Sequence, residues 1–286
     1  MTIKEIDAIL EEGNSLKSIA QSYSEIANLK IKKIRNEVER NRIFFEEISK
    51  IYDIVKAFAV QKKINITKPK KRLCILLTSN YRFYGSINSD LIKYFVGSTR
   101  ELTEVDKLII GKAGVDYFKS AKVLPNYQNL LLKGDMPDAQ ELLDLAKLSA
   151  DYSQVQVFHS KFKSLLRQQA TFTDISALSF YLEEKVKTIE EKKTDNFLKF
   201  IFEPELAKIL HFFETQVLTL LLEESFLESE LSRTASRFIT MDSAETSANS
   251  FIKEYETLKA YGKRNMVNNT ILENFASMAI MRKEDN

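Results

Sequence analysis

The sequence predicts a mixed α and β chain in which two very long terminal helices form an antiparallel coiled coil around a central α/β domain. Three observations predict this fold. Most of the 7 glycines and 4 prolines gather in the middle of the 286 residues, with none between Gly13 and Pro69 and only Gly262 after Pro204. Apolar residues recur at three- and four-residue spacing in both terminal segments. Strand-like and helix-like segments alternate between them.

The first helix is expected to run from Ile3 to Ala59 and to carry a coiled-coil pattern. At ~1.5 Å per residue it would span roughly 85 Å, more than an isolated globular core needs. Four earlier apolar residues, residues 16, 19, 23 and 26, lie one position out of phase, which predicts a local change of supercoil near residues 24–27. The expected core-facing positions are Ala27, Ile31, Ile34, Val38, Asn41, Phe45, Ile48, Tyr52, Val55 and Ala59.

The last helix is expected to begin at Glu203-Pro204-Glu205, because proline suits a first helical turn and acids suit its positive end. Asparagine at core positions fixes register at some cost in stability. Helices from opposite ends of one chain pair antiparallel if the centre is a compact insert. The later core-facing positions are expected to be Phe251, Tyr255, Leu258, Gly262, Asn265, Asn269, Leu272, Ala276 and Ala279.

The alternation of strand-like and helix-like segments in the central part of the sequence predicts a Rossmann-like α/β domain with an open, mostly parallel sheet. Strands are expected at 72–78, 107–110, 155–158 and 164–170, the last two joined by a short turn. Helices are expected at 87–96, 115–121 and 139–151. The predicted domains are therefore an N-terminal helix (1–68), the α/β domain (69–202) and a C-terminal helix (203–286).

Composition narrows the class of protein. A net charge of +2 predicts no strong attraction to nucleic acid or to lipid. The single cysteine excludes an internal disulfide framework and fits a reducing compartment. The N-terminus lacks the apolar core of a signal peptide, and no apolar run approaches the ~20 residues of a membrane span. We therefore expect a soluble chain, or one that docks onto a membrane complex through other subunits.

No catalytic, cofactor or metal site is predicted. The sequence contains neither a GxxxxGK[ST] loop nor a GxGxxG turn. Residues 111–114 (Gly-Lys-Ala-Gly) follow a predicted strand, where an anion site at the next helix N-terminus is one interpretation and a plain turn the favoured one. His159 and His211 are too few for a metal site or a triad. Cys74 lies in an apolar strand, which favours an inert thiol over a nucleophile.

Two charged clusters have competing interpretations. Acids in the last helix offer paired carboxylates, but a long exposed helix favours a solvated face; they are Glu223, Glu224, Glu228 and Glu230. A basic linker lacks the interleaved aromatic residues of a nucleic-acid site; it holds Lys62, Lys63, Lys68, Lys70, Lys71 and Arg72. Neither catalysis nor nucleic-acid binding is expected.

Five stretches, in order along the chain, resemble the γ subunit of F-type (F1) ATP synthases. Residues 78–88 (TSNYRFYGSIN) are similar to the family segment S-D-R-G-L-C-G-x-F-N, and 157–162 (VFHSKF) to V-Y-N-K-F. Residues 202–205 (FEPE) are similar to F/Y-E-P-D, and 235–244 (ASRFITMDSA) to A-A-R-M-V-A-M-D-N-A. Arg264-Asn265 stands where the family has Arg-Gln. Residues 16–23 and 268–272 depart from the family pattern.

The resemblance implies a non-catalytic rotor shaft that couples rotation to ATP synthesis or hydrolysis in a ring of α and β subunits. It implies that the other end of the chain contacts the ε subunit and the membrane ring of c subunits, on the cytoplasmic side of the membrane and without a span of its own. The implied contacts with the catalytic ring are Tyr23, Arg237, Arg264, Asn265 and Asn269. The implied contacts with the c-ring and ε are Phe200, Phe202 and Glu203.

Three alternatives stay open at this point. One is a coiled-coil scaffold or adaptor, which predicts a homodimer through the long helices where a shaft predicts intramolecular pairing. Another is a nucleotide-dependent enzyme built on the α/β centre, which the missing phosphate loop disfavours. The third is the shaft of an F1-like ATPase with a specialised role other than ATP synthesis.

Overall fold

The computed structural model describes residues 2–61, 71–102, 104–121, 123, 126–175 and 203–284. The chain forms two compact units, one of Met1–Ala27 with Phe238–Asn286 and one of Asn28–Arg237. Helix α1 (Ile3–Gln61, 59 residues) and helix α6 (Leu206–Glu284, 79 residues) contribute to both units. Long terminal helices with a central α/β sheet are the predicted fold class. The predicted domain boundaries at 68 and 202 lie outside the described residues.

The second unit contains a five-stranded sheet in the order β3-β2-β1-β4-β5. Strand β1 (Arg72–Leu77) is central and pairs in parallel with β2 (Val105–Ile110) and β4 (Gln154–Ser164). Strand β2 pairs in parallel with β3 (Gln128–Leu130), and β4 pairs antiparallel with β5 (Arg167–Asp174). The mostly parallel sheet is therefore confirmed.

Two details of the sheet differ from the prediction. The turn between β4 and β5 lies at Leu165–Leu166, because β4 continues through Ser164 instead of ending near residue 158. Strand β3 was not predicted, because it has only three residues, Gln-Asn-Leu, and two of them are polar. Its pairing with the apolar end of β2, and not its own residues, makes it a strand.

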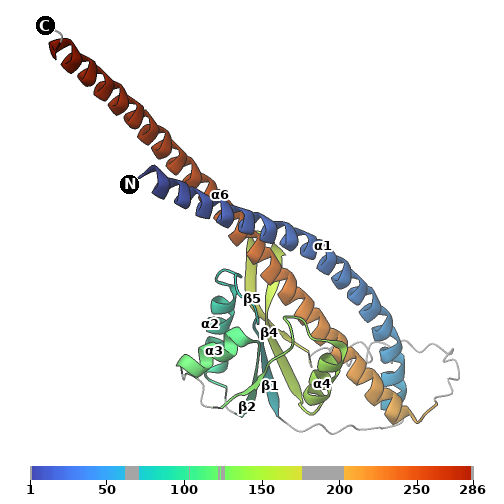
Figure 1. The fold of residues 1–286 in the computed structure, drawn as a ribbon. Coiled ribbons are helices and arrows are strands. Elements are labelled where there is room, and N and C mark those ends of the chain that lie inside the picture. Colours follow the sequence, from blue (N-terminus) through green and yellow to red (C-terminus); the bar gives the residue numbers. More distant parts are fainter. Residues whose placement is uncertain are drawn as a thin grey trace. The chain divides into compact units, whose positions relative to one another are not determined.

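Helices cover both faces of this sheet (Figure 1). Helices α2 (Ile87–Thr99) and α3 (Lys112–Ala121) pack on one face, and α4 (Ala139–Ala150) lies on the other. Alternate strand residues point to opposite faces. The face toward α2 and α3 carries Cys74, Leu76, Ile109 and Phe158. The face toward α4, the end of α1 and the start of α6 carries Leu73, Ile75, Leu77, Leu108, Ile110, Val155 and Val157.

The predicted break in the coiled-coil pattern of α1 is wrong. The buried face of α1 keeps one phase from Ile6 to Ile34, and its members include Ile6, Leu10, Gly13, Ala20, Ala27, Ile31 and Ile34. The apolar residues that suggested a break lie on the exposed side, with Leu16 64 % exposed. Small residues occupy the interface because the helices approach closely, and a Cβ added at Gly13 would lie 3.2 Å from Ile252 Cγ1.

Helix α6 also departs from its predicted pattern. It begins at Leu206, after Pro204, because the carbonyl of Glu205 accepts the first helical hydrogen bonds, from the amides of residues 208 and 209. In the first unit, Ile252 is buried whereas Phe251 and Leu258 are exposed. Residues 263–278 are all exposed, so the predicted core positions 265, 269, 272 and 276 are wrong. Helix α1 begins at Ile3, which lies beside Gly262, and therefore leaves these last turns uncovered.

The two long helices run antiparallel within each unit. In the first unit, Lys259 Nζ lies 2.5 Å from Asp7 Oδ1, and Gln21 Nε2 donates to Glu245 Oε1 at 2.7 Å. In the second unit, Asn41 Nδ2 donates to the carbonyl of Leu220 at 3.3 Å. The pairing predicted for a shaft, between the ends of one chain, is what the structure shows.

Candidate functional site

The carboxyl ends of the parallel strands β1, β2 and β3 meet at one edge of the sheet, where open α/β sheets bind their ligands. In this chain the loops at that edge bind one another. The amides of Lys112, Ala113 and Gly114 donate to Asn80 Oδ1, to the Ser79 carbonyl and to Thr78 Oγ1, each at 2.9 Å. The first-turn amides of α3 are therefore already occupied. The anion-site interpretation of residues 111–114 is therefore wrong. The plain-turn interpretation holds only for Gly111, because Lys112–Gly114 form the first turn of α3.

A buried carboxylate joins the loop after β1 to the loop after β3. Asp135 Oδ1 accepts a hydrogen bond from the amide of Asn80 at 2.5 Å, and Oδ2 accepts one from the hydroxyl of Tyr84. The Asn80 side chain donates to the carbonyls of Leu132 and Gly134 at 3.0 Å and 2.7 Å. Burial, together with the nearby carboxylates, raises the pKa of Tyr84, so its phenol remains a proton donor.

Helix α6 reaches the same edge with a fully buried arginine. Arg233 is 1 % exposed, and its guanidinium lies 3.0 Å from Glu230 Oε2 and 3.0 Å from Ser229 Oγ. It also donates to the carbonyl of Asp135 at 3.2 Å. Glu230 is itself 0 % exposed and pairs with Lys30 of α1. Arg233 and Glu230 together thus connect both long helices to the edge of the sheet.

The next turn of α6 holds the loop after β1. Ser236 Oγ donates to the carbonyl of Tyr84 at 2.7 Å, and Arg237 Nη2 donates to the carbonyl of Arg82 at 3.0 Å. The Arg237 guanidinium lies 4.1 Å from the centroid of the Tyr84 ring, within cation–π range. Residues 30, 80, 84, 135, 229, 230, 233, 236 and 237 are called the Arg233 network below.

The solvated-face interpretation of the α6 acids is therefore wrong for Glu230, although Glu224 is exposed. The signal that sequence reasoning missed is spacing. Residues 222, 226, 229 and 233 share one helix face, and the first two are buried leucine and phenylalanine. Arg233 continues this apolar face and Glu230 stands three residues before it, a pattern that indicates a buried ion pair.

Two further titratable candidates, Cys74 and His159, are buried. Burial raises the pKa of Cys74 to about 11, so its thiol stays protonated. Burial lowers the pKa of His159 to about 4, and its Nε2 lies 2.8 Å from Thr173 Oγ1. In the described part of the chain, no three His, Cys, Asp or Glu side chains are placed to hold a metal ion. None of the described helices is long and apolar enough to span a bilayer.

The residues predicted to contact partners lie in different parts of the structure. Arg264, Asn265 and Asn269 are exposed on the uncovered turns of α6, and Tyr23 is partly exposed on α1. Arg237 belongs to the Arg233 network. Glu203 is exposed just before α6, whereas the predicted contacts at 200 and 202 lie outside the described residues. All of these contacts remain predictions.

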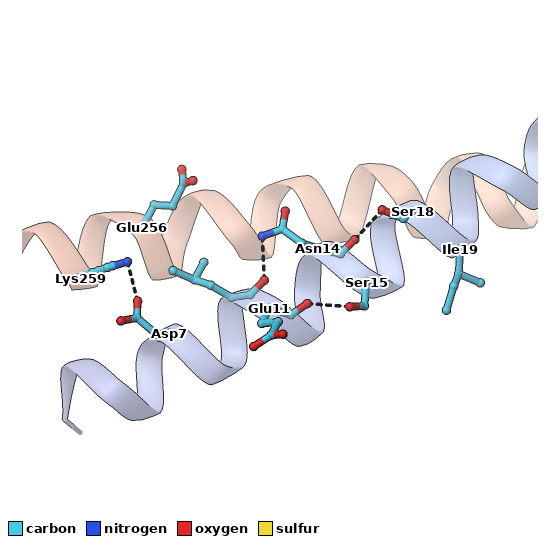
Figure 2. A pocket seen from close by; sticks show the side chains of 9 residues that line it. Asp7, Glu11, Asn14, Ser15, Ser18, Ile19, Glu256 and Lys259 are labelled. Carbon is cyan, nitrogen blue, oxygen red and sulfur yellow. Dashed lines mark hydrogen bonds and ion pairs between the residues drawn. The ribbon is translucent and has the colours of Figure 1, made fainter.

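A shallow groove of about 790 Å³ lies between α1 and α6 in the first unit (Figure 2). Lys259 reaches across it to Asp7, and the other polar side chains mostly bond to their own helix. The side-chain Nδ2 of Asn14 donates to the carbonyl of Leu10 at 2.8 Å. The groove offers no phosphate-binding arrangement, because three of its four charged lining residues are acids and the fourth, Lys259, is paired with Asp7.

Comparison with known proteins gives the family. A sequence model of the family described as ATP synthase matches residues 2–274. The chain belongs to the ATP synthase family. Among curated members of this family, the ATP synthase gamma chain of Bacteroides fragilis strain ATCC 25285 is 25 % identical over 293 residues, covering 95 % of this chain and 97 % of that protein. The ATP synthase gamma chain of Clostridium acetobutylicum is 26 % identical over 249 residues, covering 82 % and 83 %.

Solved structures of ATP synthases share the fold. A chain from the central stalk and c-ring structure of the Tetrahymena thermophila mitochondrial ATP synthase has a TM-score of 0.59 at 20 % identity, covering 79 % of this chain and 99 % of its own. A chain from the Euglena gracilis mitochondrial ATP synthase, in a structure of OSCP, F1 and c-ring, has a TM-score of 0.52 at 13 % identity, covering 91 % and 97 %.

Proposed function

We propose that this ATP synthase family member is the central rotor shaft, the γ subunit, of a rotary F-type ATPase. It would couple rotation to ATP synthesis or hydrolysis in a surrounding ring of α and β subunits. The observation that carries the proposal is the end-to-end match with curated gamma chains, 95 % of this chain against 97 % of the Bacteroides protein. Both paired helices and the sheet domain fall within that match.

The uncovered end of α6 supports the same role. Its last turns carry large apolar side chains that no described residue of this chain covers, among them Leu272 (66 % exposed) and Phe275 (65 % exposed). Contiguous exposed apolar residues mark protein–protein contacts. We propose that these turns, with Arg264, Asn265 and Asn269, lie inside the α/β ring. A rotating shaft would then bias each ring subunit in turn through differential contacts.

The proposed role is mechanical, and no catalytic step is assigned to the chain. A nucleotide-dependent enzyme is disfavoured because the strand ends that would bind a nucleotide are occupied by the Arg233 network. A homodimeric scaffold is disfavoured because α1 pairs with α6 of the same chain. The ε subunit and c-ring are proposed partners of the other end, near Glu203. They would hold the chain peripherally on the cytoplasmic side of the membrane.

Co-expression with α- and β-type subunits of the same source tests the proposal. We expect the tagged chain to elute with both subunits, and the complex to hydrolyse ATP while the chain alone does not. Analytical ultracentrifugation of the chain alone should give a monomer. Robust hydrolysis by the chain alone, or a homodimer that binds neither subunit, would overturn the proposal. Photocrosslinks from position 203 to ε or c subunits test the partners at the other end.

A further inference from the structure

The face of α6 that packs on the sheet changes character within three turns. Leu222 and Phe226 are buried in the apolar core against the sheet. At the next positions on the same face, Ser229 and Arg233 are equally buried but polar, and their bonds reach the loop after β3. Apolar contact is non-directional, so it holds a helix against a sheet without fixing where along its axis the helix sits. Hydrogen bonds to named atoms do fix that position.

Stability alone does not explain the buried charges. Removing two charges from water costs about as much as their attraction returns, and apolar replacements of similar volume are often as stable. Fixing register is the best-attested use of such groups. Here the pair Glu230–Arg233 bonds in three directions, to Lys30 of α1, to Ser229 of its own helix and to the carbonyl of Asp135.

We propose that the Arg233 network is the positioning element that fixes the axial and rotational register of α6 against the carboxyl edge of the sheet. Glu230 and Arg233 are its central positioning residues. In a rotor shaft, this fixed register would transmit torque between the paired helices and the sheet domain without slip. The torque part of this inference rests on the proposed function, whereas the register part does not.

Repulsion between like charges opposes a shift of α6 along its axis. A shift of α6 by one turn, ~5.4 Å, would bring residues 229 and 230 to the level of Arg233. The Glu230 carboxylate would then face the carbonyl and carboxylate of Asp135, and Lys30 would lose its partner. Like charges at such a site disfavour the arrangement. An apolar pair at 230 and 233 would impose no such penalty.

The register part is tested in the full-length isolated chain with Glu230→Met/Arg233→Met. Spin labels at two exposed positions, Glu224 on α6 and Lys119 on α3, report the distance between helix and sheet domain by pulsed electron resonance. We expect a narrow distance distribution for the wild type and a broadened or shifted one for the double variant. Amide exchange at Asn80 should rise on the order of tenfold or more, as expected when a charge-assisted network opens.

The matched control is Glu47→Met/Lys50→Met, which removes an ion pair of 2.6 Å on the exposed side of α1. It should change neither the distance distribution nor the exchange at Asn80. If the double variant does not fold, Arg233→Lys keeps the charge but loses the planar fork, and it should show the same changes to a lesser degree. A variant that leaves both measurements at wild-type values overturns the register role.

The torque part needs the assembled complex. Single-molecule rotation against viscous load should show wild-type ATP hydrolysis without load, with a lowered stall torque in the double variant only. Equal stall torque in the double variant and the control would overturn this part. Failure of the wild-type chain to assemble with α and β subunits would instead refute the proposed function and leave the register result standing.

Discussion

Alanine at two glycines should change stability in opposite directions. Gly111 has a φ of +97°, which side-chain-bearing residues rarely adopt, and an added Cβ would lie 2.3 Å from the carbonyl oxygen of Thr78. The strained backbone costs about 1–3 kcal/mol, and the clash with a fixed main-chain atom adds roughly 1–3 kcal/mol. Gly97 lies inside α2 with nothing within 4 Å of an added Cβ. Alanine there should gain about 1 kcal/mol of helix propensity.

Circular dichroism at 222 nm during heating measures both variants, since the chain contains no tryptophan for fluorescence. At roughly 2–4 °C per kcal/mol for a chain of this size, Gly111→Ala should melt about 5 °C or more below the wild type. Gly97→Ala should melt about 2–4 °C above it. If Gly111→Ala melted within about 1 °C of the wild type, the close packing of Gly111 against Thr78 in the loop after β1 would be wrong.

Three further predictions follow from exposure, burial and charge. Arg264→Ala should lower the turnover of the assembled complex, because a charged interface contact is worth on the order of 1–3 kcal/mol, and should leave the melting of the isolated chain nearly unchanged. Lys253→Ala, in the paired part of the same helix, is the control. Unchanged turnover in Arg264→Ala would mean that Arg264 is only solvated. Cys74, whose pKa burial raises to about 11, should resist iodoacetamide at pH 8 in the native chain and react in urea; rapid native labelling would contradict its burial. His159, whose folded pKa of about 4 lies below the ordinary value of 6.5, should contribute stability above pH 6.5 that is lost as the pH falls toward 4, by up to roughly 3 kcal/mol. A urea midpoint that falls equally in His159→Gln over this range would assign the effect to other groups.

The long helices could be predicted because their pattern is local and repeated many times. The phase of α1 was predicted correctly from Ala27 onward, where Ala27, Ile31 and Ile34 are buried. Ahead of Ala27 it was not, because large apolar residues such as Leu16 and Ile26 suggested a different phase, whereas the interface there uses Gly13 and Ala20. Small residues are weak signals in a hydrophobic pattern but allow close helix approach. The clustering of glycine and proline indicated that the sheet lies in the middle of the chain, because turns need these residues.

The spacing of residues 222, 226, 229 and 233 could have indicated that Arg233 is buried, but the partners in the Arg233 network could not be predicted from the sequence. The network's decisive contact joins Arg233 to the carbonyl of Asp135, 98 residues earlier in the chain. No local pattern specifies such a pair. The burial of Glu230 depends on Lys30, 200 residues away, and the acids of α6 read alone resemble an ordinary solvated face. Long-range polar contacts of this kind are known only once the strands have placed their loops.

The uncovered turns of α6 have a consequence for copies of the chain without partners. A single helix without a packing partner is marginal in water, and here it presents apolar side chains that include Val267, Ile271 and Met278. In a copy without partners, these turns would unfold readily and would expose both a protease site and an aggregation-prone apolar surface. In copies without partners, we therefore expect proteases to cut within the exposed turns 263–278 before they cut the paired parts of the helices.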